Sequence, residues 1–424
     1  AKGERIEKQA ELLSFDEDIG EKGEYRDYMR KEIHEQPQAV ENTLNWLIKE
    51  GKSHLPPVES LQKIDQIRIV ACGSAYHAGL VMQRVLEGLA GIPTRVDVAS
   101  EFRYQRPLLT QNTLVLAVSQ SGETADTLAG LKESKRQGVK TLSIVNVKGS
   151  TIARESDYTL FTQAGAEIAV ATTKAYSAQL VVGYWLAIEL GKLRGAIDEK
   201  RQESLFSALS ELPKKIEETL KNEGRIAQLA DLFDGAKNMF FIGRGGDYAV
   251  ALEGSLKMKE ISYVHSEAYP AGELKHGTIS LIEEGSVVIA LCTEKSLEDK
   301  MLGNIKEVKA RGADIILITK NELDDNYEFA DEKVVLPKVN NYLIPATLTV
   351  SRPIITSSLV GMIYTLILES GVEITLSSEN VSFNCSSNLT PNTPNLFTTL
   401  ARKCFKFSPI PAVNAITSQP PMYT

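Results

Sequence analysis

The chain has 424 residues, of which 43% are hydrophobic and 24% are charged, a composition typical of folded globular proteins. This length is sufficient for two or three domains with hydrophobic cores, and it excludes disorder of the chain as a whole. Lysine and arginine total 47 and aspartate and glutamate total 55, so the formal charge of −8 gives no electrostatic reason to expect binding to nucleic acid or to an anionic membrane. An anionic substrate therefore needs a local binding pocket.

The cysteine and histidine pattern predicts neither a disulfide framework nor a metal site. No CxxC pair occurs, and no histidine has metal-ligand spacing to the four cysteines, which are Cys72, Cys292, Cys385 and Cys404. Residues 1–20 are charged throughout and lack the apolar core of a signal peptide, so we expect a cytoplasmic protein. The apolar stretch 353–368 is too short for a membrane span and predicts a buried helix.

In chain order, residues 1–47 are predicted to be a linker with an amphipathic helix pair, and residues 48–195 a first domain. Within that domain the apolar runs 67–71, 113–119 and 141–146 predict strands, and the amphipathic segments 79–91 and 124–138 predict helices. Short Val/Ile/Leu strands that alternate with helices are typical of a parallel sheet covered on both faces, and ligands of such sheets bind beyond the carboxyl ends of the strands.

An internal repeat predicts a second domain of the same α/β fold. IRIVACGSAY at 67–76 returns as MFFIGRGGDY at 239–248, so that Gly73 corresponds to Gly245 and Tyr76 to Tyr248. We expect a connecting helical segment at 196–236, the second domain at 237–375, and a disordered tail at 376–424 that is rich in Ser, Thr, Asn and Pro.

The loop SQSGET at 119–124 predicts a phosphate site. It follows a buried strand and precedes a helix, so that hydroxyl groups, backbone amides near Gly122 and the positive end of the helix dipole converge on an anion. The alternative is a plain Ser/Thr helix cap. A second polar turn at 72–76 ends another strand of the domain and favours the phosphate interpretation.

The second copy lacks this hydroxyl loop and carries titratable groups instead. Glu253, Lys257 and Glu260 are spaced to share one helical face, as in an acid/base centre, although a solvated salt-bridge stripe has the same spacing. His276 lies in the loop GELKHG, which can direct an imidazole toward a substrate or carry a surface histidine.

Several long motifs together resemble the isomerase part of the glutamine:fructose-6-phosphate aminotransferase family. They are EYRDYMRKEIHEQP, ACGSAY, SQSGETADTLAGL, AEIAVATTKAYSAQL and GRGGDYAVALEGSLKMKEISYVHSEAYPAGELKHG. The resemblance covers about residues 10–350 and implies two tandem flavodoxin-like SIS domains, fructose 6-phosphate as substrate, a homodimer, and neither cofactor nor metal. The family's glutaminase domain has no counterpart in this sequence, so residues 1–47 are expected to be the end of that domain and the linker.

The resemblance also implies roles for individual residues. The catalytic set is Glu260 for proton movement between C1 and C2, His276 for ring opening from a neighbouring subunit, and Lys257 beside the glutamate. The substrate-binding set is Gly73, Ser74, Ser119, Gln120, Ser121, Thr124, Val170 and Thr172.

The carboxyl-terminal part of the sequence departs from the family. The family's terminal lysine, which forms a Schiff base with the keto sugar, has no counterpart, because no lysine occurs between Lys338 and Lys403 and the spacing of Lys403 does not fit. Three functions therefore remain open: the isomerase and amination activity, a binding-only phosphosugar protein, and a simple aldose–ketose isomerase that uses Glu260 alone.

Overall fold

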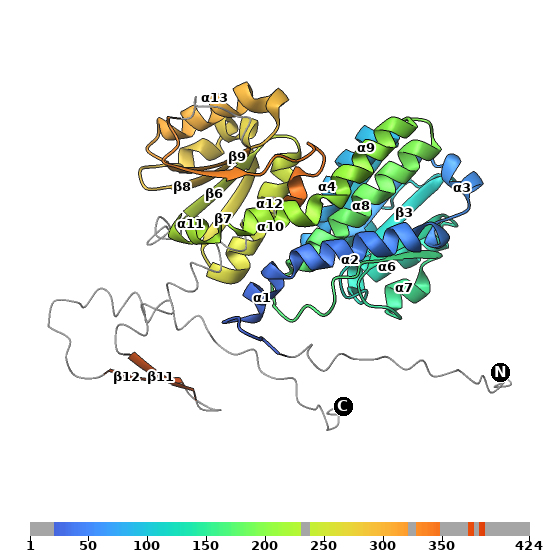
Figure 1. Cartoon of the computed structure of the whole chain (residues 1–424), viewed down its shortest axis with the longest axis horizontal. Coiled ribbons are helices and arrows are strands. Elements are labelled where there is room, and N and C mark those ends of the chain that lie inside the picture. The colour runs from blue at the N-terminus through green and yellow to red at the C-terminus, as the bar shows by residue number, and fades with distance from the viewer. Residues whose placement is uncertain (1–20, 230–237, 321–327, 348–371, 377–380, 386–424) are drawn as a thin grey trace, which may run out of the picture. The chain divides into compact units, whose positions relative to one another are not determined.

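The structure, a computed structural model, describes residues 21–229, 238–320, 328–347, 372–376 and 381–385. The chain divides into two units, Ala1–Met362 and Ile363–Thr424. The first unit contains two parallel sheets and the helices around them, and Figure 1 gives the labels of its elements.

The first sheet has five parallel strands in the order β2-β1-β3-β4-β5. Its strands are β1 (Gln66–Ala71), β2 (Thr94–Val98), β3 (Thr113–Ser119), β4 (Lys140–Val145) and β5 (Tyr158–Phe161). Every residue of the central strand β3 is buried. Such uninterrupted burial requires cover on both faces of the sheet.

Two sets of helices provide this cover. Ile69 belongs to the core formed with α4 (Gly73–Val85) and α8 (Lys174–Leu193), whereas its neighbour Val70 packs with α5 (Ala99–Phe102) on the opposite face. The shorter elements α3 (Val58–Gln62), α6 (Ala125–Arg136), α7 (Thr151–Glu155) and the π-helical turn Leu86–Ala90 complete this domain. Successive side chains of a strand point to opposite faces, so each face of the sheet has its own hydrophobic core.

The second sheet repeats the same topology. Its order is β10-β9-β8-β6-β7, which matches the first sheet when β6 corresponds to β1. The strands are β6 (Asn238–Gly243), β7 (His265–Pro270), β8 (Val287–Cys292), β9 (Asp314–Lys320) and β10 (Glu332–Leu336). Its helices are α12 (Gly246–Ser262), α13 (Glu298–Lys309) and the 3-10 turns Ala271–His276, Thr278–Leu281 and Lys295–Leu297. The predicted fold class, two tandem doubly covered parallel sheets, is confirmed.

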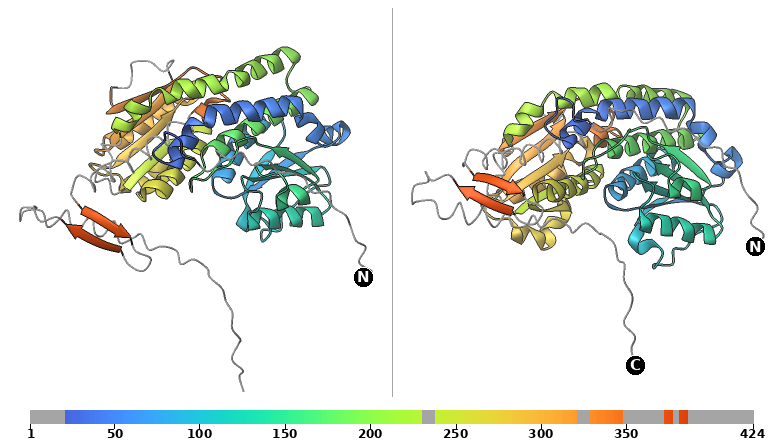
Figure 2. Two further views of the ribbon diagram at one scale, coloured as in Figure 1. Left: turned by 60° about the horizontal axis from the view of Figure 1, so that its bottom comes forward. Right: turned by 90° about the horizontal axis from the view of Figure 1, so that it is seen from below.

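Further helices lie outside the two sheets: α1 (Tyr28–His34), α2 (Gln36–Lys49), α9 (Glu199–Ser210), α10 (Leu212–Leu220), α11 (Glu223–Gln228) and the 3-10 turn Gly51–His54. Of these, α2 and α9 pack on α8, and α10 packs on α2. Figures 1 and 2 show α2, in blue, beside the green helices α8 and α10, and α2 buries Val40, Leu44 and Leu47 there. Residues that we expected to be a linker therefore contribute to the core.

The second unit contains an antiparallel hairpin of β11 (Val372–Leu376) and β12 (Val381–Cys385). The hairpin includes residues of the segment 376–424 for which we expected disorder, and the rest of that segment lies outside the described residues. The helix that we predicted at 353–368 also lies outside them. Within the described part of the chain, no helix combines the length and apolar character needed to cross a membrane.

Candidate functional site

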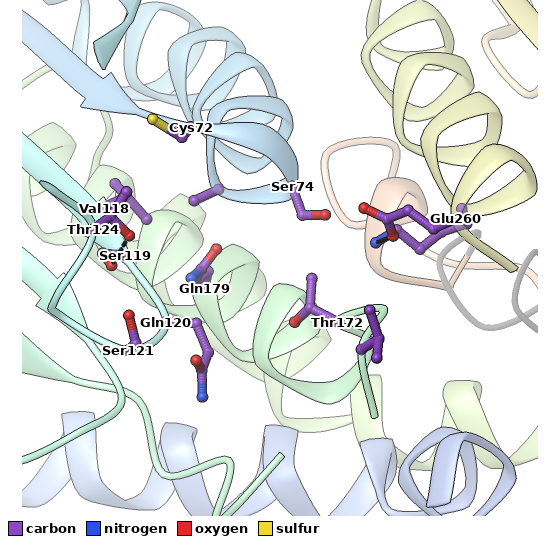
Figure 3. A pocket seen from close by; sticks show the side chains of 13 residues that line it. Cys72, Ser74, Val118, Ser119, Gln120, Ser121, Thr124, Thr172, Gln179 and Glu260 are labelled. Atoms are coloured by element: carbon purple, nitrogen blue, oxygen red, sulfur yellow. Dashed lines mark hydrogen bonds and ion pairs between the residues drawn. The ribbon is translucent and has the colours of Figure 1, made fainter. Parts of the chain in front are cut away.

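A pocket of about 220 Å³ lies at the carboxyl ends of β1 and β3. This is the point where the strand order of the first sheet reverses direction, the usual ligand site of such sheets. Nine of the eleven predicted site residues line it: Ser74, Ser119, Gln120, Ser121, Thr124, Val170, Thr172, Lys257 and Glu260. Cys72, Ala75, Val118 and Gln179 complete the lining. In Figure 3, the loop with Ser119 and Ser121 lies across the pocket from Glu260.

The hydroxyl groups of the loop 119–124 organise its backbone. Ser119 Oγ accepts a hydrogen bond from Gly122 N at 3.1 Å and lies 2.9 Å from Thr124 Oγ1, while Ser121 Oγ accepts from Glu123 N at 3.2 Å. Thr124 directly precedes α6, yet its side chain makes no capping hydrogen bond. The structure therefore does not support the alternative that this loop is only a Ser/Thr cap of the helix. The loop instead presents hydroxyl groups at the amino end of a twelve-residue helix, an environment suited to a phosphate.

Helix α12 brings the predicted charged face to the same pocket. Lys257 Nζ lies 2.5 Å from Glu260 Oε2 and 3.5 Å from Glu253 Oε1. The Lys257 side chain is only 3% exposed, so the face is not a solvated stripe, whereas the Glu260 side chain is 32% exposed and open to the pocket. Among the described residues that line the pocket, Lys257 is the one with a cationic side chain.

The network around the pocket includes Glu253, which the sequence placed on the charged face of the helix, and His77, which the sequence did not assign to the site. The buried carboxylate of Glu253 accepts a hydrogen bond from Ser74 Oγ at 2.8 Å and lies 2.7 Å from Nδ1 of His77. Ser74 and His77 belong to α4, beside the first sheet, and Glu253 belongs to α12, beside the second sheet. The network therefore links the two sheet domains next to the pocket. The helical spacing of Glu253 and Lys257 was visible in the sequence, but their partners in the other half were not.

The loop between β5 and α8 provides a further wall of the pocket. Thr172 Oγ1 donates a hydrogen bond to Glu167, whose other oxygen accepts from the backbone amides of Thr173 at 2.8 Å and Ala175 at 3.2 Å. Val170 is 99% exposed at the tip of this loop. Gln179, from the buried helix α8, was not predicted to line the pocket, although it lies in the motif AEIAVATTKAYSAQL.

Two predicted site residues are not among the described residues that line the pocket. Gly73 begins α4 with φ +55°, in the left-handed region that favours glycine, and supplies the turn that places Ser74. His276 ends the 3-10 turn Ala271–His276 and is exposed. Among the described residues of one chain, His276 is therefore not part of the pocket lining.

The corresponding crevice of the second sheet is filled by protein side chains. At the amino end of α12, Glu294 Oε1 accepts from Gly246 N at 2.8 Å, and Glu294 Oε2 pairs with Arg84 Nη2 at 2.5 Å. A carboxylate therefore occupies the place where a helix amino terminus attracts an anion. In the described part of the chain, no group of three or more His, Cys, Asp or Glu residues is arranged to hold a metal ion.

Two stretches of the chain, residues 60–189 and 232–362, match the SIS domain family. The chain belongs to the SIS-domain family. The two matches coincide with the two sheets, so each SIS domain contributes one wall of the pocket: the first its hydroxyl loop, and the second Lys257 and Glu260.

The SIS-domain chain is similar along most of its length to the isomerase region of a known family of enzymes. It is 47% identical over 348 residues to glutamine–fructose-6-phosphate aminotransferase (isomerizing) of Caldanaerobacter subterraneus, and 43% identical over 345 residues to that of Thermus thermophilus. Both matches cover 81% of this chain and 57% of the relative, so the chain spans less than two thirds of the relatives' length.

A solved structure supports the same assignment. The C-terminal domain of glucosamine-fructose-6-phosphate aminotransferase from Francisella tularensis matches with a TM-score of 0.77 and 36% identity, over 81% of this chain and 98% of that chain. The family resemblance inferred from the sequence motifs is confirmed.

Proposed function

We propose that the chain binds fructose 6-phosphate and, with ammonia, converts it to glucosamine 6-phosphate. The observation that carries this proposal is the convergence of the hydroxyl loop 119–124 with Lys257 and Glu260 on one pocket. The loop holds the phosphate through hydroxyl and amide donors, and the carboxylate of Glu260 then faces the sugar carbons. The names of the curated relatives and of the Francisella structure support the choice of substrate.

The residues present account for the proton transfers of this reaction. Ammonia condenses with the C2 carbonyl of the open-chain ketose, and water leaves to form an imine. Glu260 takes a proton from C1 and returns it to C2, while the proton of the C1 hydroxyl group passes to the imine nitrogen, which leaves the amine on C2 and the carbonyl at C1. The Lys257 ammonium, 2.5 Å from Glu260, keeps that carboxylate in place and stabilises negative charge that develops on the substrate oxygens.

His276 opens the sugar ring in this proposal, and it does so from a second copy of the chain. Its exposure, and its absence from the pocket lining of a single described chain, support a homodimer in which each site is completed by the partner copy. The substrate would then be bound by one chain and protonated at the ring oxygen by the imidazole of the other.

Substitution of Glu260 tests the proposed acid/base role. In D2O, the unmodified chain with fructose 6-phosphate and ammonium should exchange the C1 proton and form glucosamine 6-phosphate, as followed by NMR. Glu260→Gln removes the only group assigned to this proton transfer, so the rate should fall by at least about a hundredfold while the substrate still binds. The exposed Glu284→Gln is the matched control and should retain the full rate. An unimpaired Glu260→Gln variant contradicts the role.

Borohydride trapping followed by intact-mass measurement tests whether a lysine of the chain forms an imine with the sugar before ammonia reacts. The sequence has no lysine between Lys338 and Lys403, so an imine with a protein lysine requires a group other than the family's terminal lysine. A stable adduct that maps to one lysine identifies the nucleophile. Binding of fructose 6-phosphate without adduct, proton exchange or product would contradict the proposed activity and leave a phosphosugar-binding protein.

A further inference from the structure

The loop that carries Val170 and Thr172 is held from outside the SIS domain to which it belongs. Glu32, in α1, lies before residue 60, where the first SIS match begins. Its Oε1 accepts hydrogen bonds from two successive backbone amides of the loop, Ile168 N at 2.6 Å and Ala169 N at 3.0 Å. These two amides immediately precede Val170, the exposed tip of the loop at the pocket.

Glu32 is almost fully buried, which is unusual for a glutamate. The residue is 2% exposed, and burial raises the pKa of its carboxyl group above the ordinary value, although the two amide hydrogen bonds oppose this shift. Its second oxygen, Oε2, has no hydrogen-bond partner among the described residues. A buried carboxyl group with one unsatisfied oxygen is costly, so the contact made by the other oxygen is its structural purpose.

The residues that follow Glu32 attach to the other end of the same loop. Glu35 Oε2 pairs with Lys174 Nζ at 2.6 Å, and Gln36 Oε1 accepts from Ser177 Oγ at 2.6 Å. Lys174 and Ser177 lie in the first turns of α8, directly after the loop. The segment 32–36 therefore fixes both the loop and the helix start that supports it.

We propose that Glu32 is a positioning residue of the sugar site: by holding the amides of Ile168 and Ala169, it places Val170 and Thr172 against the substrate. This inference rests on the proposed function, since it assigns the loop to the sugar rather than to the phosphate. The hydroxyl loop 119–124 belongs to a different element and is held by bonds among its own residues, whereas Glu32 Oε1 bonds to Ile168 and Ala169, so phosphate binding should be independent of Glu32.

The test compares fructose 6-phosphate with inorganic phosphate as ligands of the full chain, by isothermal titration. Glu32→Ala should weaken fructose 6-phosphate binding about tenfold, the effect of losing hydrogen bonds to a charged acceptor, and leave inorganic phosphate binding unchanged. Glu32→Gln, which keeps an oxygen acceptor, should recover most of the affinity. The control Glu41→Ala removes an exposed glutamate of α2 and should bind both ligands as the unmodified chain does.

Amide hydrogen exchange distinguishes a local loss of loop structure from a general loss of stability. In Glu32→Ala, the amides of Ile168 and Ala169 should exchange faster, while those of β3 remain protected. Unchanged fructose 6-phosphate affinity in Glu32→Ala, or an equal loss for both ligands, overturns the inference alone. If the unmodified chain binds inorganic phosphate but not fructose 6-phosphate, the proposed function fails and the inference fails with it.

Discussion

At the residue scale, Asp247 shows how burial raises the pKa of a carboxyl group in this fold. Its carboxyl group is buried in the first turn of α12 and accepts hydrogen bonds from the amide and the hydroxyl group of Thr293, at 2.8 and 2.6 Å. Burial nevertheless raises its pKa to about 6, because desolvation outweighs these two bonds and Glu294 adds a nearby negative charge. The folded state therefore binds this proton more tightly than the unfolded state.

Because the folded state binds this proton more tightly, the free energy of unfolding depends on pH. The stabilisation from protonated Asp247 is fully present below the ordinary pKa of 3.8 and is lost as the pH rises through about 6. Relative to Asp247→Asn, the unmodified chain should therefore lose about 2 kcal/mol of unfolding free energy between pH 4 and pH 7. Chemical denaturation at a series of pH values measures this difference, and parallel profiles for the two proteins would exclude the raised pKa.

The sequence predicted some site residues and not their partners, for a physical reason. The spacing of Lys257 and Glu260 places them on one helical face whatever surrounds the helix, and the structure shows that pair. The bond from Ser74 to Glu253 joins residues 179 positions apart, and only the packing of α4 on α12 brings them together. Periodicity describes one helix and contains no information about such a partner.

At the element scale, the loop 119–124 depends on the backbone of Gly122. This glycine has φ +67°, and a Cβ atom added to it would lie 2.0 Å from Ser150 Oγ. Gly149 has a similar φ of +73°, but a Cβ atom there would meet no other atom within 4 Å. The two glycines therefore separate the effect of backbone conformation from the effect of close packing.

Alanine substitutions at the two glycines should differ in severity. Gly149→Ala should cost about 1 kcal/mol of unfolding free energy, from the left-handed backbone alone. Gly122→Ala adds the clash with Ser150, so its cost should be at least twice as large, and the distorted loop should lose phosphate affinity. Denaturant unfolding and phosphate titration of both variants measure these effects. Equal stabilities with intact phosphate binding would show that the loop tolerates a side chain there.

The elements themselves were largely predictable because their apolar runs are short and strongly patterned. The predicted strands at 67–71, 113–119 and 141–146 correspond closely to β1, β3 and β4. The packing of α2 on α8 was not predicted, because an amphipathic pattern shows that a helix has a buried face and does not identify what covers it. The involvement of Glu32 in the site loop was missed for the same reason.

At the scale of the whole molecule, one fold is used twice for different tasks. The first copy keeps an open crevice with a hydroxyl loop. In the second copy, Glu294 occupies the amino end of α12 and pairs with Arg84 from α4 of the first copy, and the second copy contributes Lys257 and Glu260 to the pocket of the first. The internal repeat was visible in the sequence, and so was the loss of the hydroxyl loop from the second copy. We therefore expect one phosphosugar site in each chain, although each chain contains two SIS domains.

Isothermal titration of the full chain with fructose 6-phosphate measures how many phosphosugar sites each chain has. We predict saturable binding of one molecule per chain, competition by inorganic phosphate, and an affinity about tenfold or more lower in Ser121→Ala, which lacks a hydroxyl donor to the charged phosphate. The exposed Ser280→Ala is the matched control and should bind as the unmodified chain does. The absence of saturable binding, a stoichiometry of two, or an unaffected Ser121→Ala variant would contradict the account.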